Sequence, residues 1–201
     1  MSSKDLFKHK SKSWDMNSKR VKNAKAISDA IIQKINLNKG MRVVDLGAGT
    51  GLLSYFIAPY IDIVIAVDNS ESMLEVFKEK CDEFDCKTEI IQKDISVESI
   101  NEKFDGIISS MTIHHIQNQK ELFIKLYNML NVGGFIALAD LDCEDGSFHS
   151  DNSGVFHFGF NREELKEIAL EVGFRDITFA TVSTIKKPHC DFDIFLMSGY
   201  K

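Results

Sequence analysis

Three glycines at alternate positions follow an apolar stretch in VVDLGAGTG, residues 43–51. The two valines favour a strand, and Asp45 puts a carboxylate where that strand should end. Gly47, Gly49 and Gly51 leave out side chains at the turn that follows, so the backbone could approach a ligand closely. The stretch therefore predicts a ligand-binding turn between a strand and a helix.

The spacing of the glycines bears on the kind of ligand. Nicotinamide and flavin sites prefer GxGxxG, in which the third glycine permits close helix packing and the pyrophosphate rests on the helix N-terminus. Leu52 occupies that third position here, and the pattern is GxGxG instead. The carboxylate of Asp45 would repel a pyrophosphate and attract an ammonium or sulfonium group. We expect a ligand that is positive near Asp45, which leaves a nicotinamide-dependent oxidoreductase as a less favoured alternative.

Four histidines are further candidates for chemistry. His114 and His115 follow the apolar run 104–110, and imidazole accepts a proton near neutral pH, so both are candidate catalytic bases. His149 and His157 lie in a long polar and aromatic segment, residues 142–160, which we expect to form a wall of the substrate site. The Asp, Cys and His residues of this segment lack the spacing of a recognised metal site, so we expect no metal.

The rest of the chain predicts the elements that position these residues. From about residue 17, helical and strand patterns alternate without a linker or a repeat, which indicates one α/β domain. The apolar runs are nearly continuous, as in strands that are covered on both faces. Strands are expected at residues 41–46, 62–68, 87–94, 104–110 and 133–140, and helices at 52–60, 71–84 and 119–130.

The two ends of the chain complete the predicted fold. After the fifth strand, the sequence predicts a helix at 161–174 and two alternating strands, 175–185 and 191–201, that form an antiparallel hairpin. We therefore predict a doubly wound, mostly parallel, seven-stranded Rossmann-like sheet with a C-terminal antiparallel hairpin. A helix before the first strand is predicted by apolar residues at helical spacing: Val21, Ala24, Ile27, Ile31 and Ile35.

Polar residues follow the ends of the five expected parallel strands. In doubly wound sheets, ligands bind in the crevice outside the carboxyl ends of the strands, near the point where the strand order reverses. The sequence therefore predicts one polar crevice. Its residues, strand by strand, are Asp45 with the glycines, Asp68 and Asn69, Asp94 and Ile95, Ser109 to Met111, and Asp140.

The order of these motifs resembles that of the class I S-adenosylmethionine (SAM) dependent methyltransferases over roughly residues 40–200. The resemblance rests on VVDLGAGTG, AVDNS, QKDI, FDGIISSMTIHHI and LNVGGFIALAD. It implies SAM as cofactor and S-adenosylhomocysteine (SAH) as product, with methyl transfer by in-line displacement at the sulfonium. The group most similar includes the ubiquinone and menaquinone biosynthesis methyltransferases, whose acceptors are small molecules.

The resemblance also implies individual roles. The His-His pair at 114 and 115 is common among small-molecule members, where it either does chemistry or holds the loop and the cofactor, and both roles stay open. The implied cofactor contacts are Asp45, Gly47, Ala48, Gly49 and Gly51 around the amino-acid part, Asp68 with Asn69 at the ribose hydroxyls, Asp94 with Ile95 at the adenine, and Ser110 with Met111 along the methionine side.

A physical argument supports Asp68 apart from the resemblance. A carboxylate can accept hydrogen bonds from two vicinal hydroxyls at once, and Asp68 lies 17 residues after Gly51, one helix and one strand later. The alternative role is that of a helix N-cap, for which Asn69 or Ser70 is better placed. We therefore predict that Asp68 binds the ligand.

The N-terminal segment differs in charge from the rest of the chain. Residues 1–25 carry a net charge of +6, and the remaining residues carry −12. Because the body behind this basic arm is strongly acidic, nucleic acid is disfavoured as a partner. We divide the chain into a basic arm and lid helix at 1–39 and a SAM-binding domain at 40–201. The single tryptophan, Trp14, and Asp15 are predicted to belong to a lid over the crevice.

Composition limits the remaining possibilities. A chain of 201 residues with 44% hydrophobic residues fits one domain with a substantial core. No apolar run approaches the roughly 18 residues of a membrane span, and no secretory signal is seen, so we expect a soluble cytoplasmic protein. The four cysteines are scattered, as in reduced thiols. A SAM-binding regulatory protein without turnover remains an alternative, and the acceptor and the oligomeric state stay open.

Overall fold

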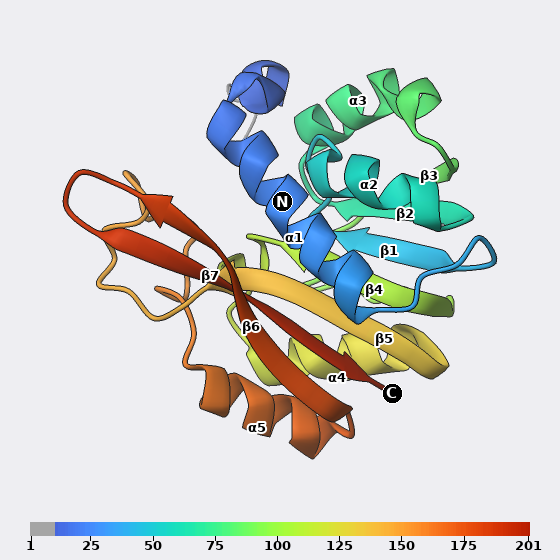
Figure 1. Ribbon diagram of the computed structural model, residues 1–201. Helices are drawn as coiled ribbons and strands as arrows, with labels where there is room; N and C mark the ends of the chain where they lie inside the picture. The colour runs from blue at the N-terminus through green and yellow to red at the C-terminus, as the bar shows by residue number, and fades with distance from the viewer. Residues whose placement is uncertain (1–10) are drawn as a thin grey trace.

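Seven strands form one sheet in the computed structural model, which describes residues 11–201 (Figure 1). The strand order is β3-β2-β1-β4-β5-β7-β6, so the order reverses between β1 and β4. The strands are β1 (Arg42–Leu46), β2 (Ile63–Asp68), β3 (Lys87–Gln92), β4 (Phe104–Ser110), β5 (Leu130–Leu141), β6 (Arg175–Lys186) and β7 (Asp191–Tyr200).

The first five strands are parallel, and the last two form the predicted antiparallel hairpin. β1 pairs with β2 and β4, β2 with β3, and β4 with β5, all in parallel register. β7 enters antiparallel between β5 and β6. The predicted fold class is therefore confirmed, and the carboxyl ends of five strands meet at one edge of the sheet.

Helices cover both faces of the sheet. Figure 1 shows α1, α2 and α3 on one side and α4 and α5 on the other. Four 3₁₀ turns also occur: η1 (Ser11–Met16), η2 (Ala58–Tyr60), η3 (Cys81–Glu83) and η4 (Ile113–His115). The α-helices are α1 (Ser18–Lys34), α2 (Leu52–Ile57), α3 (Glu71–Glu79), α4 (Gln119–Met129) and α5 (Arg162–Val172).

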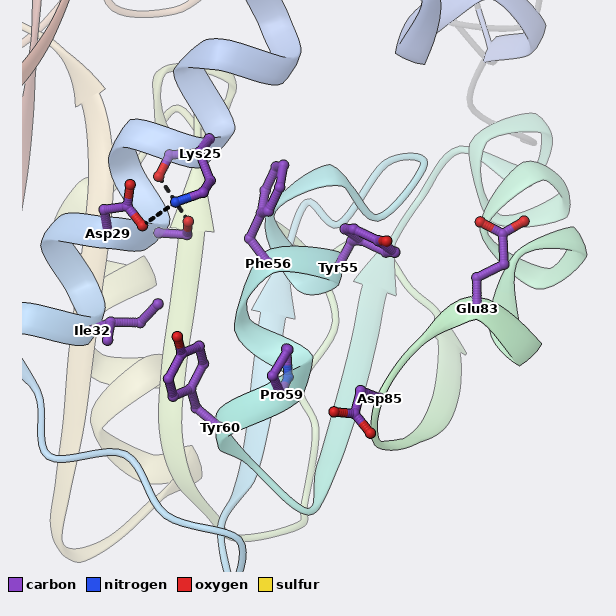
Figure 2. Close-up of a pocket in the computed structure, with 10 residues that line it drawn as sticks. Lys25, Asp29, Ile32, Tyr55, Phe56, Pro59, Tyr60, Glu83 and Asp85 are labelled. Carbon is purple, nitrogen blue, oxygen red and sulfur yellow. Dashed lines mark hydrogen bonds and ion pairs between the residues drawn. The ribbon is translucent and has the colours of Figure 1, made fainter.

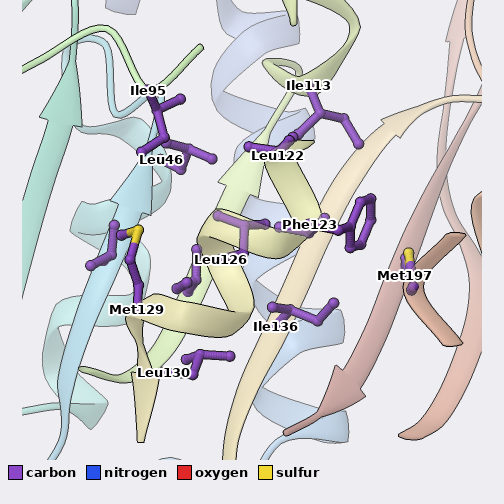
Figure 3. Close-up of a cluster of buried hydrophobic side chains, with 14 of the residues drawn as sticks. Leu46, Ile95, Ile113, Leu122, Phe123, Leu126, Met129, Leu130, Ile136 and Met197 are labelled. Carbon is purple, nitrogen blue, oxygen red and sulfur yellow. The ribbon is translucent and has the colours of Figure 1, made fainter. Parts of the chain in front are cut away.

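An apolar cluster between α4 and the sheet fixes the strands whose carboxyl ends carry the predicted site residues (Figure 3). Leu122, Phe123 and Leu126 recur at helical spacing on α4, and each is at most 1% exposed. They pack in one cluster with Leu46 of β1 and Ile136 of β5. Full burial of each such side chain stabilises the fold by roughly 1.5–3 kcal/mol. The core therefore holds β1 and β5, whose carboxyl ends carry predicted site residues, in fixed positions.

Helix α1 is part of the core on the opposite face. Asn17 caps it by accepting the backbone N–H groups of Lys19 and Arg20, and Ile27 and Ile31 are fully buried. The helix contacts α2, β6 and β7. The predicted lid region therefore includes a helix that is packed on the sheet, while residues 1–10 of the predicted basic arm lie outside the described residues.

The structure differs from the sequence-based expectations at several boundaries. The expected helix 52–60 ends at Ile57, because Pro59 lies in the 3₁₀ turn η2. The expected helix 71–84 ends at Glu79 and is followed by η3. The expectation that helices cover every strand on both faces is wrong for β3, which is one of the two edge strands and has mostly exposed side chains.

Hydropathy along the helices gives one further observation. Among residues 11–201, no helix combines the length and the apolar character that a membrane crossing requires.

Candidate functional site

The glycine turn after β1 is anchored to the end of β2. The backbone N–H groups of Gly47 and Ala48 donate to the carbonyl oxygen of Val67 at 2.7 and 3.2 Å. The N–H of Gly49 donates to the carboxylate of Asp68 at 2.8 Å. The turn is therefore held by the neighbouring strand, and its conformation does not depend on the turn residues alone.

The three glycines are needed for different reasons. All three have a positive φ, between +55° and +85°. A β-carbon on Gly47 would lie 2.1 Å from Thr112 Oγ1, and one on Gly51 would lie 2.7 Å from the Phe77 ring. A β-carbon on Gly49 would meet nothing within 4 Å. Gly47 and Gly51 thus permit protein packing, whereas Gly49 borders open space in which a ligand could lie against the backbone.

Asp68 ends β2 with its carboxylate beside this open space. It accepts hydrogen bonds from the N–H of Gly49 and the N–H of Ser70, each at 2.8 Å. The N-cap of α3 is Ser70, whose hydroxyl accepts from the N–H of Met73. Asp68 is therefore not the helix cap, and its half-buried carboxylate lies beside the open space at Gly49.

Asp45 lies deeper than the sequence suggested. Its carboxylate is 1% exposed and accepts a hydrogen bond from the hydroxyl of Ser54 on α2 at 2.6 Å. The pKa of Asp45 is raised to about 7, mainly by burial; the hydrogen bond from Ser54 opposes the increase, and the charge of Asp68 contributes to it. Asp45 therefore supports the turn from inside, and its predicted contact with a cofactor stays a prediction.

The ends of β3 and β4 supply the other predicted cofactor residues. Asp94 accepts from the N–H and the hydroxyl of Ser96, so it closes a local turn after β3. The neighbouring Ile95 is 6% exposed and belongs to the core below. Met111 has a φ of +56°, and its N–H donates to Ala139 of β5 at 2.8 Å. Ser110, which comes directly before Met111, is half-buried. Asn69, which follows Asp68 at the end of β2, is exposed.

Three histidines come together above β4 and β5. The ring centroids of His114 and His115 are 4.1 Å apart, and those of His114 and His149 are 5.0 Å apart. His114 is 1% exposed, and its Nδ1 lies 2.7 Å from the carboxylate of Asp140 at the end of β5. His115 Nδ1 lies 2.7 Å from the carbonyl oxygen of Gly154. The pair that is adjacent in sequence therefore has two different environments.

The comparisons with known proteins agree with this arrangement of the strand ends. The family model described as "Methyltransferase domain" matches residues 43–134, which span the glycine turn, Asp68 and both histidines of η4. This part of the chain is therefore similar to methyltransferase domains. The match confirms the resemblance that VVDLGAGTG and the later motifs indicate.

Curated relatives are similar over part of their length. The chain is 31% identical over 136 residues to an uncharacterized methyltransferase of Schizosaccharomyces pombe, a match that covers 60% of this chain and 48% of that protein. It is 31% identical over 111 residues to phosphoethanolamine N-methyltransferase 1 of Arabidopsis thaliana, which covers 54% of this chain and 23% of that protein. The chain thus spans half or less of the length of these relatives.

A solved structure shows the same fold. Phosphoethanolamine N-methyltransferase 2 of Haemonchus contortus, in complex with S-adenosyl-L-methionine, superposes with a TM-score of 0.73 at 18% identity. The match covers 98% of this chain and 59% of that chain. The likeness therefore extends beyond residues 43–134 to the helices and the hairpin that flank them.

The segment before α1 reaches the glycine turn. Asp15 of η1 accepts a hydrogen bond from the hydroxyl of Thr50 at 2.5 Å and forms an ion pair with Lys80 at the end of α3. The guanidinium of Arg20 lies 3.7 Å from the centroid of the half-buried Trp14 ring. The predicted lid residues therefore lie next to the predicted cofactor turn.

The loop after β5 covers the histidine cluster. It returns to β5 at Phe160, which forms an isolated bridge with Asp142. The N–H groups of Phe156 and His157 donate to the carbonyl oxygen of His114. His157 Nε2 lies 3.1 Å from the carbonyl oxygens of Ile116 and Gln117, so this histidine holds the loop, and its predicted contact with substrate stays a prediction.

Two further observations limit the site. Residues 11–201 contain no group of three His, Cys, Asp or Glu side chains placed to hold a metal ion, and Asp142 instead forms a bidentate pair with Arg162. A shallow pocket between α1 and α2, which Tyr55, Tyr60 and Asp85 help to line (Figure 2), lies near the amino ends of β2 and β3. The pocket therefore lies away from the carboxyl ends of the strands, where the predicted site residues are found.

Sequence analysis missed three residues that complete the site. The sequence places Asp140 at the end of the fifth strand, but its spacing assigns it no separate role. A buried strand that ends in an acidic residue is a usable signal where a His-His pair follows a neighbouring strand. Thr50 and Lys80 were not singled out, because their contacts with Asp15 join positions 35 and 65 residues apart. Local residue spacing does not predict contacts between positions so far apart in the chain.

Proposed function

We propose that the protein is a SAM-dependent methyltransferase that acts on a small-molecule acceptor. One observation carries the proposal: the glycine turn leaves open space against the backbone of Gly49, next to the carboxylate of Asp68, which accepts the N–H of that glycine. The similarity of residues 43–134 to methyltransferase domains and the shared fold support it.

The described residues fit the chemical groups of SAM. The open space at Gly49 admits a ligand against the backbone, and the Asp68 carboxylate suits vicinal hydroxyls. The acidic groups Asp45 and Asp68 favour the positive charge of a sulfonium and an ammonium. When bound, SAM would supply an electrophilic methyl group, and we assign Asp94, Ile95, Ser110 and Met111 to the rest of the cofactor as the sequence predicted.

The protein's own contribution to methyl transfer is positioning. Methyl transfer to a nucleophile needs alignment of the reacting atoms and exclusion of water, and it needs a base where the nucleophile must lose a proton. We propose that η1 and the loop 142–160 supply the cover, and that His114, His115 and His149 border the acceptor. A cytoplasmic location is part of the same proposal.

The curated relatives suggest which acceptors to try first. The Arabidopsis relative is named a phosphoethanolamine N-methyltransferase, so phosphoethanolamine belongs in the first screen with other small amines, phenols and quinols. The ubiquinone-type group that the sequence suggested stays a prediction.

Calorimetric titration with SAH and with NAD tests the cofactor, and transfer of a labelled methyl group from SAM to the acceptor panel tests turnover. We expect SAH to bind and NAD not to bind. Binding of NAD alone would replace the proposal with an oxidoreductase, and SAH binding without any turnover would favour a regulatory SAM-binding protein.

A further inference from the structure

The carboxylate of Asp140 fixes the proton position on His114. Asp140 is fully buried and accepts the N–H of Leu141 at 2.8 Å and the N–H of His114 at 3.2 Å. Its third contact is Nδ1 of His114 at 2.7 Å. An ionised carboxylate only accepts hydrogen bonds, so Nδ1 carries the proton and donates to Asp140.

This tautomer leaves Nε2 of His114 as an unprotonated acceptor. That nitrogen is buried and has no hydrogen-bond partner among residues 11–201. A buried polar atom without a partner costs roughly 1–3 kcal/mol, so an unpaired acceptor in η4, beside the end of β5, indicates a place for a donor from a ligand. Nε2 of His149 is also buried without a partner.

Burial makes protonation of His115 and His149 less favourable. Burial lowers the pKa of His149 to about 4, and the neighbouring His114, His115 and Lys187 add to this effect. Burial and His114 also lower the pKa of His115. The Nδ1 atom of His114 lies 2.7 Å from the Asp140 carboxylate, which places a negative charge beside any imidazolium that forms there.

We propose that Asp140 is a positioning residue that holds His114 with its Nε2 ready to accept the proton of the methyl acceptor, beneath the loop that carries His149. The inference rests on the proposed function and deepens it. It requires an acceptor whose nucleophilic atom carries a proton, a hydroxyl or an ammonium, and it separates His114 from His115, whose Nδ1–H donates to Gly154 and holds the loop.

The proton and electron pairs balance in this scheme. The acceptor's oxygen or nitrogen forms a bond to the methyl carbon, and the carbon–sulfur bond breaks with its electron pair left on sulfur, which gives SAH. The proton of the acceptor atom goes to His114 Nε2. The imidazolium that forms keeps its Nδ1–H on the Asp140 carboxylate, which offsets the charge in a buried site.

The first arm of the test is nitrogen NMR of ¹⁵N-histidine-labelled protein saturated with SAH, compared between wild type and Asp140→Asn. We expect His114 to carry its proton on Nδ1 in the wild type and to shift toward Nε2–H in the variant. His114→Asn assigns the resonance, and His115→Asn is the matched control that should leave the His114 tautomer unchanged. A proton on Nε2 of His114 in the wild type would overturn the proposal.

The second arm is turnover of the acceptors found in the panel described above. We expect kcat of Asp140→Asn to fall by about 100-fold, the lower end of general-base effects, with KM and SAH affinity within about twofold of wild type. A kcat that is unchanged in Asp140→Asn would overturn the proposal. If no acceptor is turned over at all, the proposed function fails instead, and the tautomer measurement still decides the positioning role.

Discussion

The carboxylate of Asp68 accepts the backbone N–H of Gly49 at 2.8 Å, which joins the end of β2 to the glycine turn that follows β1. The contact makes one unit of two motifs that lie 19 residues apart in the chain. The two groups proposed to hold the ribose and the amino-acid part of SAM are therefore fixed relative to each other before any ligand binds.

Asp68→Asn should weaken SAH binding more than it weakens the fold. The amide cannot accept from two ribose hydroxyls and from Gly49 and Ser70 as the carboxylate can, and charge-assisted bonds contribute roughly 1.5–3 kcal/mol each. We expect a loss of SAH affinity of at least about tenfold by calorimetry. Asp62→Asn is the control at the other end of the β2 region, where Asp62 pairs with Lys87. Equal losses in both variants would contradict the assignment.

A matched pair of glycines separates ligand contact from backbone strain. Gly49 and Gly133 both have a positive φ, and a β-carbon would meet nothing within 4 Å at either position. Alanine at each should therefore cost a similar roughly 1–2 kcal/mol in unfolding free energy. We expect Gly49→Ala to weaken SAH binding strongly and Gly133→Ala to leave it unchanged. Thermal denaturation and calorimetry on the two variants check both statements, and unimpaired SAH binding in Gly49→Ala would remove the turn from the cofactor site.

The buried carboxylate of Asp45 should make stability depend on pH. Its pKa is raised from 3.8 to about 7 in the folded protein, mainly by burial. Between these values the folded state holds a proton that the unfolded state releases, so this contribution to stability is lost as pH rises through the window.

Asp45→Asn removes this titration. We expect the unfolding free energy of the variant, relative to wild type, to rise by up to about 4 kcal/mol between pH 4 and pH 8, since one pKa unit corresponds to about 1.4 kcal/mol. Urea denaturation across this range measures the difference. Ser54→Ala removes the hydrogen bond that lowers the pKa, so it should extend the dependence to higher pH. A constant difference between Asp45→Asn and wild type would contradict the raised pKa.

The fold and the cofactor turn could be predicted because their signals are local. Nearly continuous apolar runs predict strands such as 104–110, and the bounds of β4 agree with that prediction. Asp68 could be found because it ends such a run. The depth of Asp45 could not, since it depends on how Ser54 of α2 packs over the strand.

The acceptor side was harder to predict because its contacts cross long stretches of the chain. His114 and His115 are neighbours in sequence, yet their roles diverge through Asp140 and Gly154, which lie 26 and 39 residues later. The exposure of β3 likewise depends on the strand order, which places it at the edge of the sheet. Neither these long-range contacts nor the order of strands in the sheet can be predicted from residue spacing alone.

The lid prediction can be tested through the single tryptophan. Trp14 is half-buried beneath Arg20, and the next residue, Asp15, is tied to Thr50 of the glycine turn and to Lys80. A ligand at the turn should change the surroundings of η1, so we expect the emission of Trp14 to shift on addition of SAH.

Asp15→Ala should abolish most of the shift and lower SAH affinity by about tenfold, as expected for loss of a charge-assisted hydrogen bond. Asp29→Ala, which removes an acid paired with Lys25 on α1 and not joined to η1, is the control and should preserve both. Since no other tryptophan contributes, unchanged emission of the wild type at saturating SAH would show that η1 does not respond to the cofactor.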